Sequence, residues 1–324
     1  AAKTQDKIAL VREGYKPVAY YVACLFFCIA DLSMIDPMYQ YSMEWYCNLF
    51  VLGIEKAEKG DNLEERLANL NDSFTFILYQ NVCRSLFEKD KLLFSFLLCT
   101  KIMISLGKLD PGILRFLLAG NTAMDLEKPM PATPDNWLTE KIWGDLLAMQ
   151  HIGPFKGFID KYFLGALDKW QHIYDSKTPG EDIDQLLLDA KYAEDAPPGD
   201  DAEHAAFTPF ERLCILRCVR PDMIVPRVTL FVAEEMGKRY IEPPPFDLMA
   251  CYNDSNCATP LIFVLTPGAA PTSGLLKRAD ELGFGGKRMV AISLGQGQGP
   301  IAETAIMEAQ DKGTRTRLQT RRPC

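Results

Sequence analysis

The stretch LIFVLTPGAAPTSGLLK, residues 261–277, constrains the fold of this chain more than any other. It opens on LIFVLT, a continuous apolar run of the kind that a parallel β-strand buried on both faces requires. A turn rich in glycine and proline follows, and a helical pattern begins at Thr272. Strand, glycine loop and helix is the order in which proteins build a phosphate-binding loop. The stretch therefore predicts an α/β core, and its loop is the first candidate for a nucleotide site.

The residues that follow complete one βαβα unit. A helix is predicted over Thr272–Leu282, a second strand over Met289–Leu294 and a second helix over residues 300–312. An α/β core of this kind needs about five strands, whereas the unit has two. We therefore expect an incomplete sheet with an unpaired edge and a tendency to aggregate.

The first loop lacks the chemistry of a Walker-type loop, which reads G-x-x-x-x-G-K-[ST]. In that loop the lysine neutralises phosphate charge and the hydroxyl ligates magnesium. Here five residues instead of four separate Gly268 from Gly274, leucines replace the lysine and the hydroxyl residue, and Lys277 comes two positions late. Only Thr272 and Ser273 offer hydroxyl groups to a phosphate. Because phosphoryl transfer rests on positioned charge and metal, we predict a degenerate loop that neither binds nor hydrolyses a nucleotide.

A second glycine-rich turn, Gly295-Gln296-Gly297-Gln298-Gly299, joins the second strand to the second helix. Its spacing is G-x-G-x-G, whereas dinucleotide-binding proteins use G-x-G-x-x-G after the first strand of the unit. We interpret Gly295, Gly297 and Gly299 as residues required for tight backbone packing of a strand-to-helix turn. No nucleotide is expected there either.

Helices are predicted for the part of the chain before this core. Asp36-Pro37 opens an apolar-periodic run that Gly60 closes, and Asp61 with Asn62 opens the next helix. Further helices are predicted over residues 91–106, 110–120, 135–150 and 155–174. Their tryptophans recur at helical spacing, which is typical of core residues.

Periodicity is lost from Ser176 to Ala206, where residues 194–203 carry five acids and no bases, as in a solvated loop. Thr208 and Glu211 then fit a capping box ahead of helices over residues 211–219 and 225–236. Three prolines in Glu242–Phe246 predict an extended connector. The predicted organisation is a mostly α-helical N-terminal part followed by an incomplete α/β core, divided into residues 1–175 (helical), 176–207 (acidic linker), 208–259 (helical lead-in and proline-rich connector), 260–312 (α/β core) and 313–324 (arginine-rich tail).

Composition narrows the choice of partners. The net charge of −8 and the pI near 5.1 argue against a nucleic-acid-binding protein, which ordinarily has a basic face. The longest apolar run, Val18–Ala30, is shorter than the about 20 residues that cross a bilayer. We therefore predict a helix that is apolar all round because it is buried all round, and no membrane partner.

Metal and catalytic sites are not expected. Cys24 with Cys28, and Cys214 with Cys218, lie one helical turn apart, but the three histidines that a metal site would draw on are scattered: His151, His172 and His204. We predict buried thiols instead. His151 and His172 fall on predicted helices without an evident serine or cysteine partner, so no catalytic residue, metal or cofactor is assigned to this segment.

Several long phrases resemble the heavy chain of dynein, the AAA+ microtubule motor, and most of all its axonemal members. They occur in the order of that family from about residue 8 to about residue 312: YKPVAYYVACLFFCIADLSMIDPMYQYSMEWY, VCRSLFEKDKLLFSFLLC, FERLCILRCVRPDMIVPRV, EPPPFDLMACYNDSN, TPLIFVLTPGAAPTSGLLK and AISLGQGQGPIAE.

The resemblance implies that the chain covers the end of the fifth AAA+ module and the start of the sixth. Residues before the acidic tract would surround the fifth module, near the buttress of the microtubule-binding stalk, and the sixth would begin at about Pro260. These modules do not hydrolyse ATP in dyneins, which implies a mechanical role inside an ATP-driven, minus-end-directed motor of cilia and flagella. ATP and magnesium would belong to the parent motor. The implied partners are the rest of the heavy-chain ring and, through the parent complex, microtubules and the light and intermediate chains, in the cytoskeleton of the axoneme.

Two features depart from the family. Ala270 replaces the usual aspartate of the loop, and the tail 313–324 replaces an apolar strand led by tryptophan. Four arginines within residues 315–322 are not expected in a central parallel strand, because buried unpaired guanidinium groups are costly. We therefore expect a frameshift, altered splice or gene-model break near residue 313. The missing initial methionine is expected of a piece of a longer protein.

Two other classes of function remain open at this point. One is a free-standing enzyme that binds a nucleotide at the P-loop-like turn or a dinucleotide at the second glycine turn. The other is a helical scaffold with a vestigial α/β tail, which would keep its partner after the tail is deleted.

Overall fold

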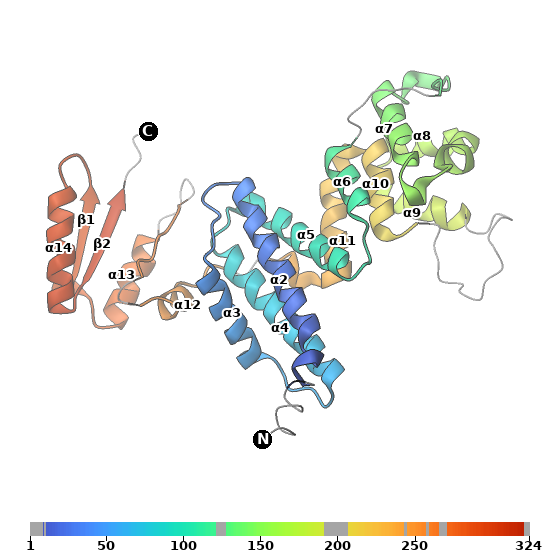
Figure 1. The fold of residues 1–324 in the computed structure, drawn as a ribbon. Helices are drawn as coiled ribbons and strands as arrows, with labels where there is room; N and C mark the ends of the chain where they lie inside the picture. Colours follow the sequence, from blue (N-terminus) through green and yellow to red (C-terminus); the bar gives the residue numbers. More distant parts are fainter. Residues whose placement is uncertain are drawn as a thin grey trace. The chain divides into compact units, whose positions relative to one another are not determined.

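The structure is a computed structural model that describes residues 9, 11–120, 128–190, 207–242, 245–256, 259–265 and 271–320. The chain divides into two compact units, Ala1–Pro244 and Pro245–Cys324. All regular structure described in the first unit is helical, and both described strands belong to the second (Figure 1). The predicted fold class, a helical part followed by an incomplete α/β core, is therefore confirmed.

The described part of the first unit contains ten α-helices: α2 (Lys16–Ala30), α3 (Met43–Lys56), α4 (Leu63–Cys83), α5 (Glu88–Ser105), α6 (Pro111–Ala119), α7 (Glu140–Gln150), α8 (Leu167–Asp175), α9 (Pro179–Ala190), α10 (Pro209–Val219) and α11 (Ile224–Met236). Helix α2 packs against α4 and α5, and α3 packs against α4. Helix α10 packs against α6, α7, α9 and α11. Helices that precede and follow the acidic tract thus belong to one unit.

Aromatic side chains fill the core of the first unit. The predicted core tryptophans Trp137, Trp143 and Trp170 are all buried, which confirms their interpretation. The indole of Trp170 donates a hydrogen bond to the carbonyl oxygen of Tyr162 at 2.8 Å. A buried indole N–H needs such a partner, so this bond keeps the large ring compatible with an apolar interior.

Several helix ends lie where capping residues predicted them. The side chain of Asn62 accepts from the Glu65 amide at 2.9 Å and opens α4. Thr208 and Glu211 form the predicted capping box of α10: the Thr208 hydroxyl accepts from the Glu211 amide, and the Glu211 carboxylate accepts from the Thr208 amide. Each contact satisfies an amide that the first turn of a helix leaves without a backbone partner.

Three helix predictions need correction in their bounds. The helix predicted over residues 135–150 begins only at Glu140, after a 3₁₀ turn at Pro134–Asn136. Helix α3 begins at Met43 with Ser42 as its N-cap, not after Pro37, because the Asp36 carboxylate accepts from the Met38 amide and closes a turn instead. The predicted single helix over residues 155–174 is also wrong. A π-helical turn, Ile159–Phe163, and a 3₁₀ turn, Leu164–Ala166, precede α8.

Helix α9 lies inside the stretch that we predicted as an acidic linker. Ile183 and Leu187, one turn apart, are buried there. The acidic residues around this pair, Glu181, Asp182 and Asp184, hid the apolar face from an interpretation based on charge. The acidic tract at residues 194–203 itself lies outside the described residues.

Helix α2 is not buried on all sides, so the prediction of a helix that is apolar all round because it is buried all round is wrong. Val18, Leu25 and Ile29 face the core, whereas Tyr20 and Phe27 are exposed. Among the described residues one helix, Lys16–Met34, has 19 residues and is long and apolar enough to cross a membrane by length and composition alone. Core helices of soluble proteins pass that test as well.

The second unit contains α12 (Leu248–Asn253), α13 (Thr272–Glu281), β1 (Met289–Leu294), α14 (Gly299–Lys312) and β2 (Arg315–Thr320). Strands β1 and β2 pair in parallel, from Met289 opposite Arg315 to Leu294 opposite Thr320. Helix α14 connects the two strands and packs on both. The predicted strand 289–294 and helices 272–282 and 300–312 are confirmed to within a residue or two.

The predicted first strand is wrong over its described residues. Residues 261–265 have no regular structure, and Ile262 and Val264 are exposed. A parallel strand needs neighbours to satisfy its amides, and the described sheet consists of β1 and β2. Of the predicted proline-rich connector, residues 243 and 244 lie outside the described residues and residues 245–247 have no regular structure.

Candidate functional site: glycine loops and an arginine clamp

The start of α13 is the described part of the degenerate phosphate loop. Gly268 and Ala270 lie outside the described residues. Thr272 is the first residue of α13, and no side chain caps this end of the helix. The Thr272 hydroxyl accepts a hydrogen bond from Nη2 of Arg317 at 3.1 Å. One of the two hydroxyl groups that the loop offers to a phosphate therefore contacts a guanidinium group from β2.

Lys277 lies away from this end of the helix. Five residues at about 1.5 Å each place it roughly 7.5 Å along the helix axis from Thr272. It lines a groove of about 520 Å³ together with Gly274 and Arg278 of α13 and the segment Pro245–Met249. The cation that should serve a phosphate loop therefore faces a groove beside the helix.

Ser273 and Gly274 contribute little to the geometry of a binding site. Ser273 is exposed, and no atom of the described chain lies within 4 Å of a Cβ built on Gly274. Gly274 is also helical, so no unusual backbone angle demands a glycine there. A side chain could therefore be accommodated at Gly274, whereas a Walker loop needs glycine at the corresponding position.

The second glycine turn depends on its backbone angles more than on close packing. Gly297 has φ +80°, a conformation that favours glycine. No described atom lies within 4 Å of a Cβ built on Gly295 or Gly299. Our interpretation of tight packing is therefore wrong for these two glycines. The turn closes through a hydrogen bond from the Gln298 amide to the Gly295 carbonyl oxygen at 3.2 Å.

Two arginines of β2 hold positions that the sequence analysis missed. Arg315 lies over the rings of Tyr252 and Phe284, 4.7 and 4.5 Å from their centroids, and also donates to the Tyr252 hydroxyl. Arg317, two residues later on the same face of the strand, reaches Thr272. A strand tolerates both because it is one of two in the described sheet, so their guanidinium groups are not enclosed between layers. Residues two apart lie on the same face of a strand, so the spacing of Arg315 and Arg317 in the sequence could have indicated that both side chains point to one side.

Three of the four paired cysteines, Cys28, Cys214 and Cys218, are buried, as predicted. Burial raises the pKa of Cys28 and of Cys214 to about 12, and it also raises the pKa of Cys218 well above its ordinary value. Cys24 is only half-buried. Thiols with such pKa values stay protonated at neutral pH and do not act as nucleophiles or metal ligands. Over the described residues, no three His, Cys, Asp or Glu side chains converge as a metal site would require.

The predicted histidine positions are exposed. His172 lies in α8, and His151 directly follows the last residue of α7. His204 lies outside the described residues.

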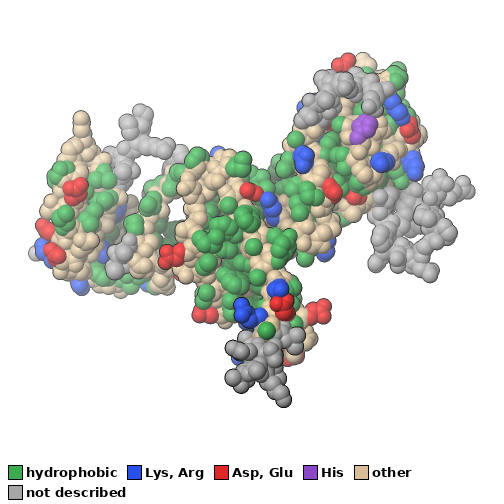
Figure 2. Space-filling view, in the orientation of Figure 1, with side chains coloured by type: hydrophobic (Ala, Val, Ile, Leu, Met, Phe, Trp, Pro, Cys, Tyr) green, Lys and Arg blue, Asp and Glu red, His purple; other side chains and the backbone are tan. Residues whose placement is uncertain are grey.

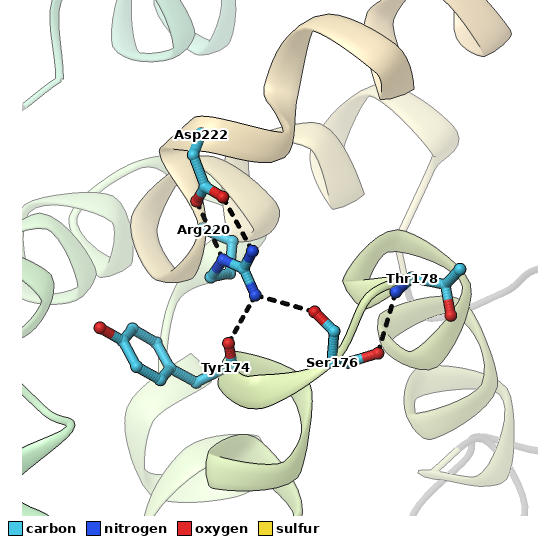
Figure 3. Close-up of polar contacts among 5 residues, drawn as sticks. All are labelled: Tyr174, Ser176, Thr178, Arg220 and Asp222. Atoms are coloured by element: carbon cyan, nitrogen blue, oxygen red, sulfur yellow. Dashed lines mark hydrogen bonds and ion pairs between the residues drawn. The ribbon is translucent and has the colours of Figure 1, made fainter.

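A polar group in the described part of the first unit joins several helix ends. We call it the arginine clamp and define it as Arg220 with its partners Asp222, Tyr174 and Ser176. Arg220 follows the last residue of α10, and its Nε and Nη2 donate to the two carboxylate oxygens of Asp222 at 2.9 and 2.8 Å. Its Nη1 donates to the carbonyl oxygens of Tyr174 and Ser176 at 2.5 and 2.9 Å (Figure 3). These carbonyls belong to the end of α8, where a cation is favourable.

The arginine clamp also organises the turn into α9. The Ser176 hydroxyl accepts from the Thr178 amide at 3.0 Å (Figure 3). It also donates to the carboxylate of Asp182. The paired carboxylate raises the pKa of Arg220, and the hydrogen bonds from Arg220 lower the pKa of Asp222. One side chain therefore joins the ends of α8 and α10 and the start of α9.

Further arginines from α10 and α11 reach acids on helices that precede the acidic tract. Arg212 and Arg227 both contact the carboxylate of Asp184 in α9, the first at 3.3 Å. Arg217 lies 3.6 Å from the carboxylate of Asp145 in α7. Because all these side chains are mostly shielded from water, the ion pairs are screened less than surface pairs. They tie the helices on both sides of residues 191–206 together.

Helices joined by polar ties, followed by an α/β unit with a degenerate phosphate loop, define a P-loop-like structural module. Residues 256–320 match the model of the dynein heavy chain region D6 P-loop domain. The chain is 46% identical over 319 residues to dynein axonemal heavy chain 3 of Homo sapiens, covering 98% of this chain and 7% of that protein. It is 42% identical over 314 residues to dynein axonemal heavy chain 1 of Rattus norvegicus, covering 97% of this chain and 6% of that protein. The chain belongs to the dynein heavy chain family, in its axonemal branch.

Proposed function

We propose that this chain is a structural and mechanical segment of an axonemal dynein heavy chain, without nucleotide hydrolysis of its own. The observation that carries the proposal is the position of Lys277, which lines a groove beside α13 instead of its N-terminal end. The guanidinium group of Arg317 at Thr272 adds to this argument, because it leaves a hydroxyl of the loop engaged by a protein group. Among the described residues, the lysine of the segment therefore does not stand at the end of α13 where phosphoryl transfer would need it.

The mechanical part of the proposal rests on the helix ties. The arginine clamp and the pairs at Asp184 and Asp145 join helices that lie far apart in the sequence. Force applied to one helix would reach the others through short charged contacts and a close-packed aromatic core. This is what a segment that transmits strain inside a motor requires.

The setting of the segment is part of the same proposal. The chain spans about 7% of the length of the heavy chains that it matches first. We place it in the ring of such a heavy chain, in the axoneme of a cilium or flagellum, with microtubules and the light and intermediate chains as partners of the whole complex. ATP and magnesium would act at other modules of that ring.

Ligand binding tests the absence of a nucleotide site. Thermal unfolding of the 324-residue chain is measured with magnesium–ATP, with NAD and without ligand. No stabilisation is expected at sub-millimolar ligand. Stabilisation by ATP that disappears in Lys277→Ala would overturn the proposal in favour of a nucleotide-binding enzyme.

A second measurement uses the parent heavy chain. Lys277→Ala should leave its ATPase rate unchanged, since the lysine takes no part in hydrolysis. Arg220→Ala should leave basal ATPase nearly unchanged but reduce its coupling to microtubule gliding. A fall in basal ATPase with Lys277→Ala would contradict the assignment.

A further inference from the structure

Helix α2 carries an exposed apolar stripe that neither the core nor the proposed function uses. We define the α2 stripe as Tyr20, Ala23, Phe27 and Ala30 of α2 together with Met34, the last residue of the 3₁₀ turn Asp31–Met34 that continues the helix; the spacings are three, four, three and four. All five are exposed, and the exposed fractions of Tyr20, Phe27 and Met34 are 65%, 63% and 87%. Figure 2 shows hydrophobic side chains gathered over the region of α2 and α3, with charged side chains at the margins of the patch.

The stripe belongs to a helix whose orientation is fixed. The opposite face of α2 holds Leu25, Cys28 and Ile29, each with no accessible surface. The neighbouring helix α3 is held by a hydrogen bond from the Tyr46 hydroxyl to the Val22 carbonyl oxygen at 2.6 Å. Because α2 cannot turn to hide the stripe, its apolar area stays in water unless another element covers it. Exposed apolar areas of this kind mark interaction surfaces.

The spacing of the stripe selects an α-helix as its partner. Alternation of three and four residues keeps side chains on one line of a helix, which is the arrangement of helix–helix seams. Small residues at Ala23 and Ala30 alternate with large ones, and so create holes that accept large side chains from a facing helix. From Tyr20 to Met34 the stripe extends roughly 21 Å, or about four helical turns.

The charges beside the stripe argue against a lipid surface. Lys16 pairs with Glu13 at 2.6 Å and Asp31 pairs with Lys101 at 2.8 Å, so ion pairs lie at both ends of α2. A helix that spans a bilayer alone would need an apolar surface free on all sides, whereas one face of α2 packs on α4 and α5. A one-sided stripe between ion pairs suits a protein partner.

We propose that the α2 stripe is the docking surface for an amphipathic α-helix from another part of the same heavy chain. The relatives place this region within a polypeptide of which it makes up 7%. A helix on that same polypeptide has a far higher effective concentration at the stripe than a second copy does. The docked helix presents large apolar residues at spacings of three and four to Ala23 and Ala30. This inference rests on membership of a heavy chain and not on the absence of hydrolysis.

The test places a photo-crosslinking amino acid, p-benzoylphenylalanine, at position 27 of the parent heavy chain. Phe27 is exposed, so the replacement does not disturb the core. Crosslinked peptides are mapped by mass spectrometry after irradiation. The expected product joins position 27 to residues of the same polypeptide outside this segment, spaced three or four apart. A second variant, Ala23→Arg in the same background, should lose that product because arginine fills the hole beside it.

A matched control carries the crosslinker at position 225 of α11. Val225 is 60% exposed, close to the value for Phe27, but does not belong to the α2 stripe. It should not yield the product obtained from position 27. Crosslinks to a second heavy chain, to lipid or to peptides without helical spacing would overturn the proposal, as would no crosslink from position 27. The ATPase of the crosslinker variant separates this outcome from a failure of the proposed function.

Discussion

The two units of this chain use aromatic and aliphatic residues in opposite ways. In the first unit most large apolar side chains enclose one another, and Trp143, Trp170 and Phe163 are fully or almost fully buried. In the described part of the second unit, the only hydrophobic side chains that are buried are Ala279 and Ala302. Apolar composition alone therefore does not make a core. A helical bundle can close on itself, whereas a parallel sheet of two strands leaves one or both faces and both edges open.

The polar contacts of the two units also differ, as the shielded Arg220 of the first unit and the exposed pair of Lys312 and Glu308 in the second show. In the first unit, Arg220 is largely shielded and fixed by four hydrogen bonds to Asp222, Tyr174 and Ser176. In the second, Lys312 and Glu308 pair at 2.8 Å one turn apart on the exposed face of α14. The first arrangement restrains three chain segments, and the second restrains one helix turn.

The largest expected difference between the units is in how well each protects its backbone from hydrogen exchange and from proteolysis. Backbone amides of β1 and β2 should exchange with deuterium at least about a hundredfold faster than those in the middle of α4, because opening of the second unit exposes little buried surface. Limited proteolysis of the chain should leave the helical segment before Tyr174 and degrade residues 261–324. Equal protection in both units would break the comparison.

Core substitutions give the next largest contrast. Trp170→Ala removes a fully buried ring that packs on Phe158 and Phe163, so the free energy of unfolding should fall by about 3–5 kcal/mol. The matched change in the second unit is Ile262→Ala, at a side chain that is 82% exposed. It should alter stability by less than about 0.5 kcal/mol. Urea unfolding followed by tryptophan fluorescence and circular dichroism measures both variants. Similar losses for the two would show that residues 261–265 have a covered core of their own.

The sequence predicted the first unit better than the second for a physical reason. Helices are specified locally, so Asn62, Asp110 and Thr208 with Glu211 marked helix starts that the structure has. Gly237, with φ +99°, likewise marked the end of α11. The predictions of helix bounds failed where tertiary packing, and not the local sequence, determines the backbone conformation. Gly157 takes φ +75°, and the chain then forms a π-helical turn that no cap announces.

Strands need partners that local sequence does not name. The sequence LIFVLT predicts a buried strand, yet its described residues pair with no strand of the described sheet and have no regular structure. The arginines of residues 315–320 argue against a central strand, yet the segment pairs with β1 as a strand of a two-stranded sheet. The candidate site followed the same division. The degeneracy of the loop could be derived from Lys277, but the contact of Arg317 with Thr272 depended on strand pairing.

Removal of the arginine clamp should give a smaller but measurable loss. Arg220→Ala deletes charge-assisted hydrogen bonds to Asp222 and to the carbonyls of Tyr174 and Ser176, so unfolding should become easier by about 2 kcal/mol. Lys312→Ala in the second unit breaks an exposed pair and should cause no measurable change. Urea titrations at neutral pH compare the two variants. Equal losses would mean that the clamp contributes no more than a surface ion pair.

The smallest expected effect is a pH dependence that distinguishes the same two pairs. Hydrogen bonds from Arg220 lower the pKa of Asp222, so its folded pKa lies below the unfolded value of about 3.9. The stability that the pair adds is present above that unfolded value and is lost as the pH falls through the folded pKa. The effect is small because the Asp222 side chain is 58% exposed.

Glu308 supplies the matched control for this pH dependence. Its hydrogen bond from Lys312 lowers the pKa of Glu308 too, but both side chains stay open to solvent. Urea midpoints from about pH 6 down to about pH 3 should therefore fall less steeply for Asp222→Asn than for the unchanged chain, and equally steeply for Glu308→Gln. If Glu308→Gln flattens the profile as much as Asp222→Asn, acid sensitivity reflects general charge repulsion. In that case the shielding of Arg220 would not distinguish the first unit from the second.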